Sequence, residues 1–142
     1  MKPIIISHRG NTHGPDKYQE NNPEVIQSLL DRQIPCEVDV WSYKNKFYLG
    51  HDTGIYLVKE SWLQNHYLFC HAKNTEALYK MMMNYKIHCF WHDKDECVLT
   101  NQYMIWQAHY KNLTDRTIVV DKSERPNYNA KCYGICCDYM SI

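Results

Sequence analysis

The stretch Ile4-Ile5-Ile6-Ser7-His8-Arg9-Gly10 does most to decide the fold of this chain. Three β-branched residues in succession are typical of a buried strand in a parallel sheet. The polar residues behind them then stand at the carboxyl end of that strand, where parallel sheets and barrels place their chemistry. The imidazole of His8 can move protons near neutral pH, and the guanidinium of Arg9 offers a planar fork for phosphate oxygens.

A second motif, Glu37-Val38-Asp39, lies in a strand that we expect over residues 36–41. Side chains at i and i+2 of a strand share one face, so Glu37 and Asp39 point the same way. Two carboxylates are costly to bury together without a cation or hydrogen bonds, and a hard divalent metal ion resolves that cost. Taken alone, the pair has a simpler interpretation as a solvated face with an ion pair to lysine.

A third motif, Gly50-His51-Asp52, follows an extended piece at residues 46–49. His51 is a second candidate for proton transfer. Asp52 either orients this imidazole or caps a turn, and the glycine either lets a ligand approach the backbone or serves a turn. A single histidine is more often a surface or core residue, so the inference depends on His51 occurring together with the other motifs.

Strands and helices alternate in the first half of the chain. Asn22-Pro23 opens one helix and Asn74 caps another, on whose core face we place Met81-Met82-Met83. The strands we expect are residues 4–6, 36–41, 46–49, 67–70, 88–91, 104–106, 117–120 and 134–137. Later connections are too short for full helices. We predict one α/β domain over residues 1–142, a compact, shortened (β/α) TIM-like barrel with reduced helices in its second half; the alternative is an open or irregular barrel.

Composition excludes several classes of protein. The formal net charge of the 142 residues is zero, so we expect no nucleic-acid partner, which would need a basic surface. Seven cysteines lack C-x-x-C spacing, and we expect all of them reduced. Met1-Lys2-Pro3 leads directly into the first strand, and no apolar run approaches the ~20 residues of a membrane span. We therefore expect a cytoplasmic protein with no integral membrane segment.

Taken in order, these motifs resemble the glycerophosphodiester phosphodiesterase family of the phosphatidylinositol-phospholipase-C-like superfamily. The resemblance covers residues 4–54, where Glu20-Asn21-Asn22 parallels the family's Glu-Asn-Thr. It continues weakly at His71-Ala72-Lys73 and returns at residues 134–139, similar to a late strand that ends in aspartate. About half of the chain has no clear counterpart.

The resemblance implies a metal-dependent phosphoric diester hydrolase that uses two histidines as acid and base. Its substrate would be a glycerophosphodiester, a lysophospholipid-like molecule or another small phosphodiester. The implied roles are catalysis by His8 and His51, phosphate binding by Arg9 and Lys73, and metal binding by Glu37 and Asp39, with Glu20 close to the metal. The attacking group, water or a substrate hydroxyl, stays open.

One departure from the family falls at the third acidic metal ligand, where this chain has His71. The resemblance implies Mg²⁺ or Ca²⁺, whereas an imidazole ligand suits Mn²⁺ or another transition ion better. Alternatively His71 does not ligate, and water or a residue such as His92 or Asp93 takes the place. Two further hypotheses follow: a catalytically impaired phosphodiester- or metal-binding protein on the same fold, and a metal-binding structural or host-interaction protein.

Overall fold

The computed structural model describes residues 2–141 as an α/β structure with one ten-stranded mixed sheet and few helices. The strands are β1 (Ile4–His8), β2 (Cys36–Tyr43), β3 (Lys46–Leu49), β4 (Tyr56–Val58), β5 (Leu68–Ala72), β6 (Cys89–Trp91), β7 (Cys97–Leu99), β8 (Ile105–Gln107), β9 (Thr117–Asp121) and β10 (Gly134–Cys137). The helices are α1 (Pro23–Asp31), α2 (Glu60–Leu63) and α3 (Thr75–Met82). Every strand expected from the sequence is present within one or two residues; β4 and β7 were not expected.

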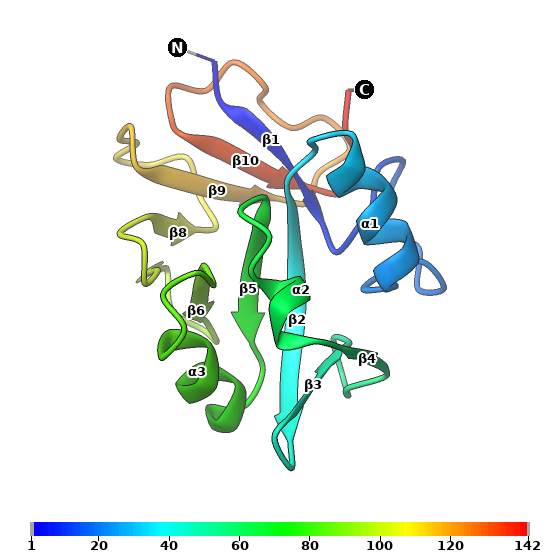
Figure 1. Ribbon diagram of the computed structural model, residues 1–142. Helices are drawn as coiled ribbons and strands as arrows, with labels where there is room; N and C mark the ends of the chain where they lie inside the picture. The colour runs from blue at the N-terminus through cyan, green and yellow to red at the C-terminus, as the bar shows by residue number, and fades with distance from the viewer. Residues whose placement is uncertain (1, 142) are drawn as a thin grey trace.

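Most strands form one parallel array in the order β6-β5-β2-β1-β10-β9-β8. The hairpin of β3 and β4 pairs antiparallel with the far half of the long strand β2, and β7 pairs antiparallel with β8. Figure 1 shows β2 running through the middle of the molecule, with β1, β10 and β9 crossing it at a steep angle. The first and last strands, β1 and β10, therefore lie in the middle of the array and not at its edges.

The sheet is not closed, because the described strands β6 and β8 do not pair with each other. Side chains bridge this seam. The amide oxygen of Asn101 accepts the backbone N–H of Cys89 at 2.8 Å, and its amide nitrogen donates to the carbonyl of Ile87 at 2.7 Å. The rings of Phe90 and Trp106 lie 4.5 Å apart across the same seam. The structure thus supports an α/β fold with a strongly curved sheet, and it leaves strand-paired barrel closure unsupported.

Strands β1, β5 and β10 each carry an apolar residue and then a polar residue on the concave face, whereas β2 presents Glu37 and Asp39 there. A buried apolar cluster covers that face on the side nearer the amino ends of the strands: Ile6, Phe69, Phe90, Met104, Trp106, Ile118 and Cys136. Two residues further along three of these strands stand His8, His71 and Asp138. Because the period of a strand is two, the same strands that bury the apolar layer carry these polar groups directly above it.

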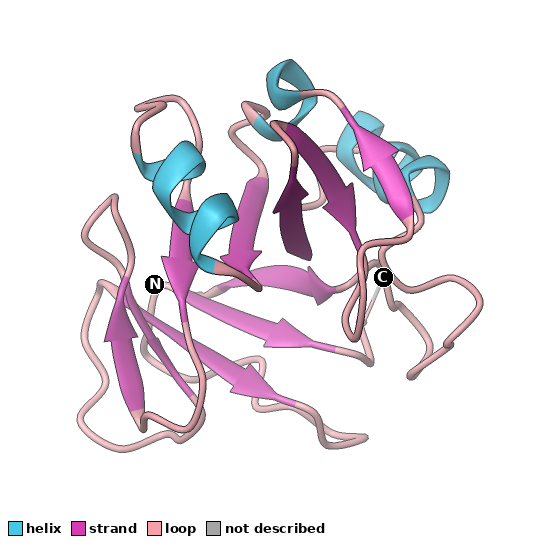
Figure 2. Ribbon diagram, turned by 90° about the horizontal axis from the view of Figure 1, so that it is seen from below, coloured by secondary structure: helices cyan, strands magenta, loops and turns pink. Residues whose placement is uncertain are grey.

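Helices cover the opposite face of the first half of the sheet (Figure 2). Asn22 and Asn74 cap α1 and α3 by accepting the N–H groups of Glu24 and Ala77, as the sequence predicts. The expectation that the methionine run lies in the core was wrong in part. Met81 is fully buried, but Met82 and Met83 are 54% and 66% exposed, because α3 ends there and turns only one face to the sheet.

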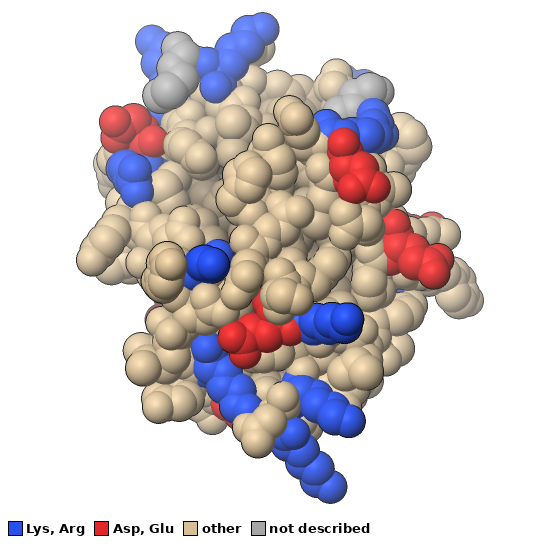
Figure 3. Space-filling view, in the orientation of Figure 1, with Lys and Arg blue, Asp and Glu red and all other residues tan. Residues whose placement is uncertain are grey.

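No helix among residues 2–141 is long and apolar enough to cross a membrane, and α1, the longest, has nine residues. On the face shown in Figure 3, basic and acidic side chains are distributed over a mostly uncharged surface. This distribution agrees with the zero net charge of the chain.

Candidate active site

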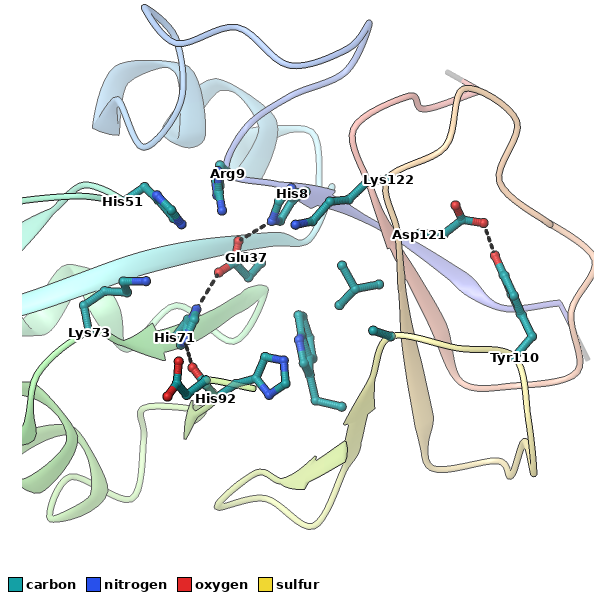
Figure 4. A pocket seen from close by; sticks show the side chains of 14 residues that line it. His8, Arg9, Glu37, His51, His71, Lys73, His92, Tyr110, Asp121 and Lys122 are labelled. Carbon is teal, nitrogen blue, oxygen red and sulfur yellow. Dashed lines mark hydrogen bonds and ion pairs between the residues drawn. The ribbon is translucent and has the colours of Figure 1, made fainter. Parts of the chain in front are cut away.

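The residues singled out by the sequence meet in one cavity at the carboxyl ends of the parallel strands. The cavity has a volume of about 640 Å³, and the predicted site residues that line it are His8, Arg9, Glu37, His51, His71 and Lys73. Figure 4 shows these side chains directed toward a common space from β1, β2, β5 and the segments that follow β3 and β5. Asp39 lies behind this surface, fully buried.

Glu37, Asp39 and His71 form a group that could hold a metal ion, with one ligand atom of each within 4.8 Å of the others. The register of β2 and β5 places Asp39 directly beside His71. The Nδ1 atom of His71 lies 3.2 Å from Asp39 Oδ1 and 3.8 Å from Glu37 Oε2. Its other ring nitrogen, Nε2, lies 2.9 Å from the backbone carbonyl of His92 and donates to it.

That last hydrogen bond determines what His71 presents to the carboxylates. A neutral imidazole that donates through Nε2 keeps a lone pair on Nδ1, and this lone pair faces two acidic side chains. The lone pairs of His71 Nδ1 and of the carboxylate oxygens repel one another unless a cation lies between them or the ring is protonated. Metal-binding histidines characteristically donate their second N–H to a backbone carbonyl in this way.

The carboxylates are also short of partners. Glu37 and Asp39 are 2% and 0% exposed, yet Glu37 Oε1 and Asp39 Oδ1 accept no hydrogen bond from residues 2–141. Burial, and after it the charge of Asp39, raises the pKa of Glu37 well above its usual value. Burial alone would also raise the pKa of Asp39, but the contact with His71 and the charge of Arg9 hold it well below its usual range. A bound cation would compensate both buried charges.

The second oxygen of Asp39 is held by residues whose roles were not expected. The amide nitrogen of Asn21 donates to Asp39 Oδ2 at 2.9 Å, and Arg9 Nε lies 3.2 Å from the same oxygen. Arg9 Nη1 also lies 3.5 Å from Glu20 Oε1. The guanidinium is therefore engaged by two carboxylates on one side while it lines the cavity on the other.

Glu20 is not one of the three clustered ligands. Its Oε2 accepts a hydrogen bond of 2.8 Å from Asn11, and its Oε1 faces Arg9. It is thus part of the shell that surrounds Arg9. Metal binding by Glu20 remains a prediction that depends on the resemblance.

His8 is buried and oriented by a carboxylate. Its Nδ1 donates to Asp138 Oδ1 at 2.8 Å, and the amide of Asn11 donates to the same oxygen at 2.8 Å. These bonds offset the burial of Asp138 and lower the pKa of that carboxyl. Nε2 of His8 is left facing the group of Glu37, Asp39 and His71, 3.8 Å from Glu37 Oε1. Asp138 directly follows strand β10, and this position at the end of an expected strand is what indicates it in the sequence.

His51 lies on the turn after β3, and in Figure 4 it stands on the other side of Arg9 from His8. Its Nδ1 contacts Asp52 Oδ1 at 2.7 Å, but the two side chains are 44% and 94% exposed. Gly50 has a φ of +156°, and a Cβ on it would lie 1.9 Å from the carbonyl oxygen of Thr53. Glycine is therefore required for the turn that presents His51.

The far wall of the cavity comes from the second half of the chain. Its polar lining comprises His92, Asp93, Tyr110, Asp121 and Lys122, with Trp106 and Val120 between them. Burial, and after it the hydrogen bond that the hydroxyl donates to Asp121, raises the pKa of Tyr110. Burial alone would also raise the pKa of Asp121, but hydrogen bonds from Ser123 and Tyr110 lower it. Lys122 was not predicted, although it follows Asp121 at the end of β9.

No protein-family model, curated protein or solved structure matches this chain.

Proposed function

We propose that this protein is a metal-dependent phosphodiester hydrolase with His8 and His51 as its base and acid. The observation that carries the proposal is a cluster of two buried carboxylates and one imidazole, with two oxygens that accept no hydrogen bond from residues 2–141, at a cavity that His8 and His51 also line. The resemblance to the glycerophosphodiester phosphodiesterase family agrees with this arrangement. The substrate we propose is a small phosphodiester, of the glycerophosphodiester or lysophospholipid-like kind.

The same reasoning favours a shortened (β/α) barrel as the fold. The parallel strands enclose one apolar layer, and side chains bridge the seam between β6 and β8. An active site at the carboxyl ends of the strands is the usual arrangement in such barrels.

Glu37, Asp39 and His71 would hold the metal; the two carboxylates suit Mg²⁺ or Mn²⁺, and the imidazole nitrogen favours Mn²⁺ of the two. When bound, such an ion neutralises charge on the phosphate and lowers the cost of nucleophilic attack. Lys73 lines the cavity beside the cluster, and Lys122 lines it on the far wall. Both amines can neutralise phosphate oxygens, which matters because Arg9 is already engaged by Asp39 and Glu20.

Both histidines turn Nδ1 toward a carboxylate, so the two roles require different protonation: His8 with a free lone pair on Nε2, and His51 with a proton on both ring nitrogens. Because His8 donates from Nδ1 to Asp138, its Nε2 can accept the proton of the attacking hydroxyl. As the new oxygen–phosphorus bond forms, the bond to the leaving oxygen breaks. That oxygen takes a proton from Nε2 of His51, whose Nδ1 faces Asp52. The proton gained by His8 and the one lost by His51 then balance through solvent.

A second candidate is a phosphodiester- or metal-binding protein that does not turn over. The occupied guanidinium of Arg9 favours it, since an arginine held by two carboxylates is less available to a phosphate. The high exposure of His51 and Asp52 favours it as well.

The test is hydrolysis of bis-p-nitrophenyl phosphate before and after treatment with EDTA, followed by addition of Mn²⁺, Mg²⁺ or Ca²⁺. We expect activity that EDTA removes and a divalent ion restores. Glu37→Gln should abolish both metal binding and activity. Glu24→Gln, the same change on the exposed face of α1, should preserve both and is the matched control. Activity that resists EDTA would refute the proposal, and metal binding without turnover would favour the second candidate.

A further inference from the structure

One edge of β2 changes its partner at Asp39. β1 pairs with β2 as far as His8 and Glu37, and β3 pairs with β2 from Val40 onward. Asp39 falls between the two partner strands. Its carbonyl accepts the N–H of Gly50 at 3.1 Å, whereas its own N–H is bound by a side chain, the amide oxygen of Asn21, at 2.9 Å.

Asn21 is built to make this contact. It is 1% exposed and has a φ of +60°, a conformation that asparagine tolerates better than most residues. Its backbone N–H donates to the carbonyl of Arg9 at 2.9 Å. Both the backbone and the side chain of Asn21 are therefore fixed before any ligand arrives.

The second contact of Asn21 is with the carboxylate of Asp39. Its Nδ2 donates to Oδ2 at 2.9 Å, and Arg9 Nε approaches the same oxygen at 3.2 Å. Oδ1 is left facing His71 Nδ1 at 3.2 Å and accepts no hydrogen bond from the described residues. Asp39 thus offers one oxygen to the cluster, and Glu37 adds Oε1, which accepts no hydrogen bond from the described residues, and Oε2, which lies 3.8 Å from His71 Nδ1.

We propose that Asn21 is a positioning residue that holds Asp39 to a single ligand oxygen and so makes the site prefer Mn²⁺ or Mg²⁺ over Ca²⁺. The inference rests on the metal site of the proposed function. Ca²⁺ takes six to eight oxygen ligands and often binds a carboxylate through both oxygens, while the smaller ions need fewer protein oxygens and retain water. With Asn21 in place, the larger ion lacks the second oxygen of Asp39.

The test compares Asn21→Gly with Asn22→Gly by calorimetric titration of Mn²⁺ and Ca²⁺ into the full chain. Glycine accepts the positive φ of residue 21 and removes both side-chain contacts with Asp39. Asn22 caps α1 next door, where glycine is also tolerated, so this variant is the matched control. Loss of an outer-shell partner costs about 10–100-fold in metal affinity. We expect a loss of that size for Mn²⁺ in Asn21→Gly, a smaller loss or a gain for Ca²⁺, and wild-type values in Asn22→Gly.

A second variant, Asn21→Asp, guards against a failure of Asn21→Gly to fold. It keeps an acceptor for the N–H of Asp39 but loses the donor to Oδ2, so it should shift the preference toward Ca²⁺ as well. Equal losses for the two ions in the variants would show that Asn21 supports only the fold, and would overturn the inference. A wild-type protein that binds neither ion would refute the metal site itself.

Discussion

The two histidines assigned to proton transfer stand in opposite surroundings. His8 is 7% exposed at the end of β1, and its imidazole is held by Asp138, which Asn11 holds in turn. His51 lies on a turn, contacts Asp52 at the surface, and has no buried partner among the described residues. The folded core thus fixes the orientation of His8, whose proposed role is that of the base, and a local turn presents His51, the proposed acid. Loss of the first histidine should therefore affect stability and activity together, and loss of the second should affect activity alone.

The largest effect is expected from His8→Ala. Loss of a general base lowers turnover by about 10²–10⁴-fold. The variant also leaves buried Asp138 with fewer partners, which costs about 1–3 kcal/mol in the free energy of unfolding. Urea denaturation and initial rates measure the two effects. A His8→Ala protein with an unchanged diesterase rate would remove the proposed mechanism.

His51→Ala should sharpen the contrast because its effect depends on the leaving group. For an alkyl phosphodiester, whose leaving oxygen needs a proton, we expect a loss of about 10²–10⁴-fold. For bis-p-nitrophenyl phosphate the loss should be much smaller, since p-nitrophenolate leaves without one. The urea midpoint should stay at its wild-type value. Equal losses for the two substrates would argue against His51 as the acid.

Asp138→Asn tests whether the buried carboxylate orients His8. Loss of a hydrogen bond to a charged group, about 1.5–3 kcal/mol, corresponds to a rate loss of about 10–100-fold. Because the folded protein lowers the pKa of Asp138, its contribution to stability is present above the unfolded pKa and is lost as the pH falls through the lower folded pKa. The variant should therefore show a weaker loss of stability between neutral and acidic pH, measured by thermal denaturation. If wild type and variant lost stability equally as the pH falls, Asp138 would make no contribution to the pH dependence of stability.

The smallest effect is expected from Asp52→Ala. A contact between exposed groups contributes about 0–1 kcal/mol, so the rate should fall by less than about fivefold and less still at high salt. Comparison of this variant with Asp138→Asn at two salt concentrations measures the difference between the two regions directly. A loss for Asp52→Ala as large as that for Asp138→Asn would mean that the turn is ordered around His51 in the working enzyme.

The sequence predicts those parts of the molecule for which a local motif, a helix cap or the two-residue period of a strand determines where the side chains lie. Glu37 and Asp39 share a face because the period of a strand is two, and the asparagine caps locate α1 and α3. Asn11 and Asn21 carry no comparable signal, since their roles arise only when segments distant in the chain meet. Asn21 completes an edge of β2 where two strands exchange, and no local pattern reveals that exchange. The open seam between β6 and β8 depends in the same way on a side chain, that of Asn101.

The open seam between β6 and β8 also allows the strands to follow one another along the chain in a second order. The paired strands run β4-β3-β2-β1-β10-β9-β8-β7, so the first and last strands, β1 and β10, are parallel neighbours in the interior of the sheet. A chain opened between residues 94 and 96, with its old ends joined by a linker long enough to return along β1, would pass from β7 through β10 to β1 and β2 in spatial sequence. A circular permutation at the seam would therefore cut no ladder between strands.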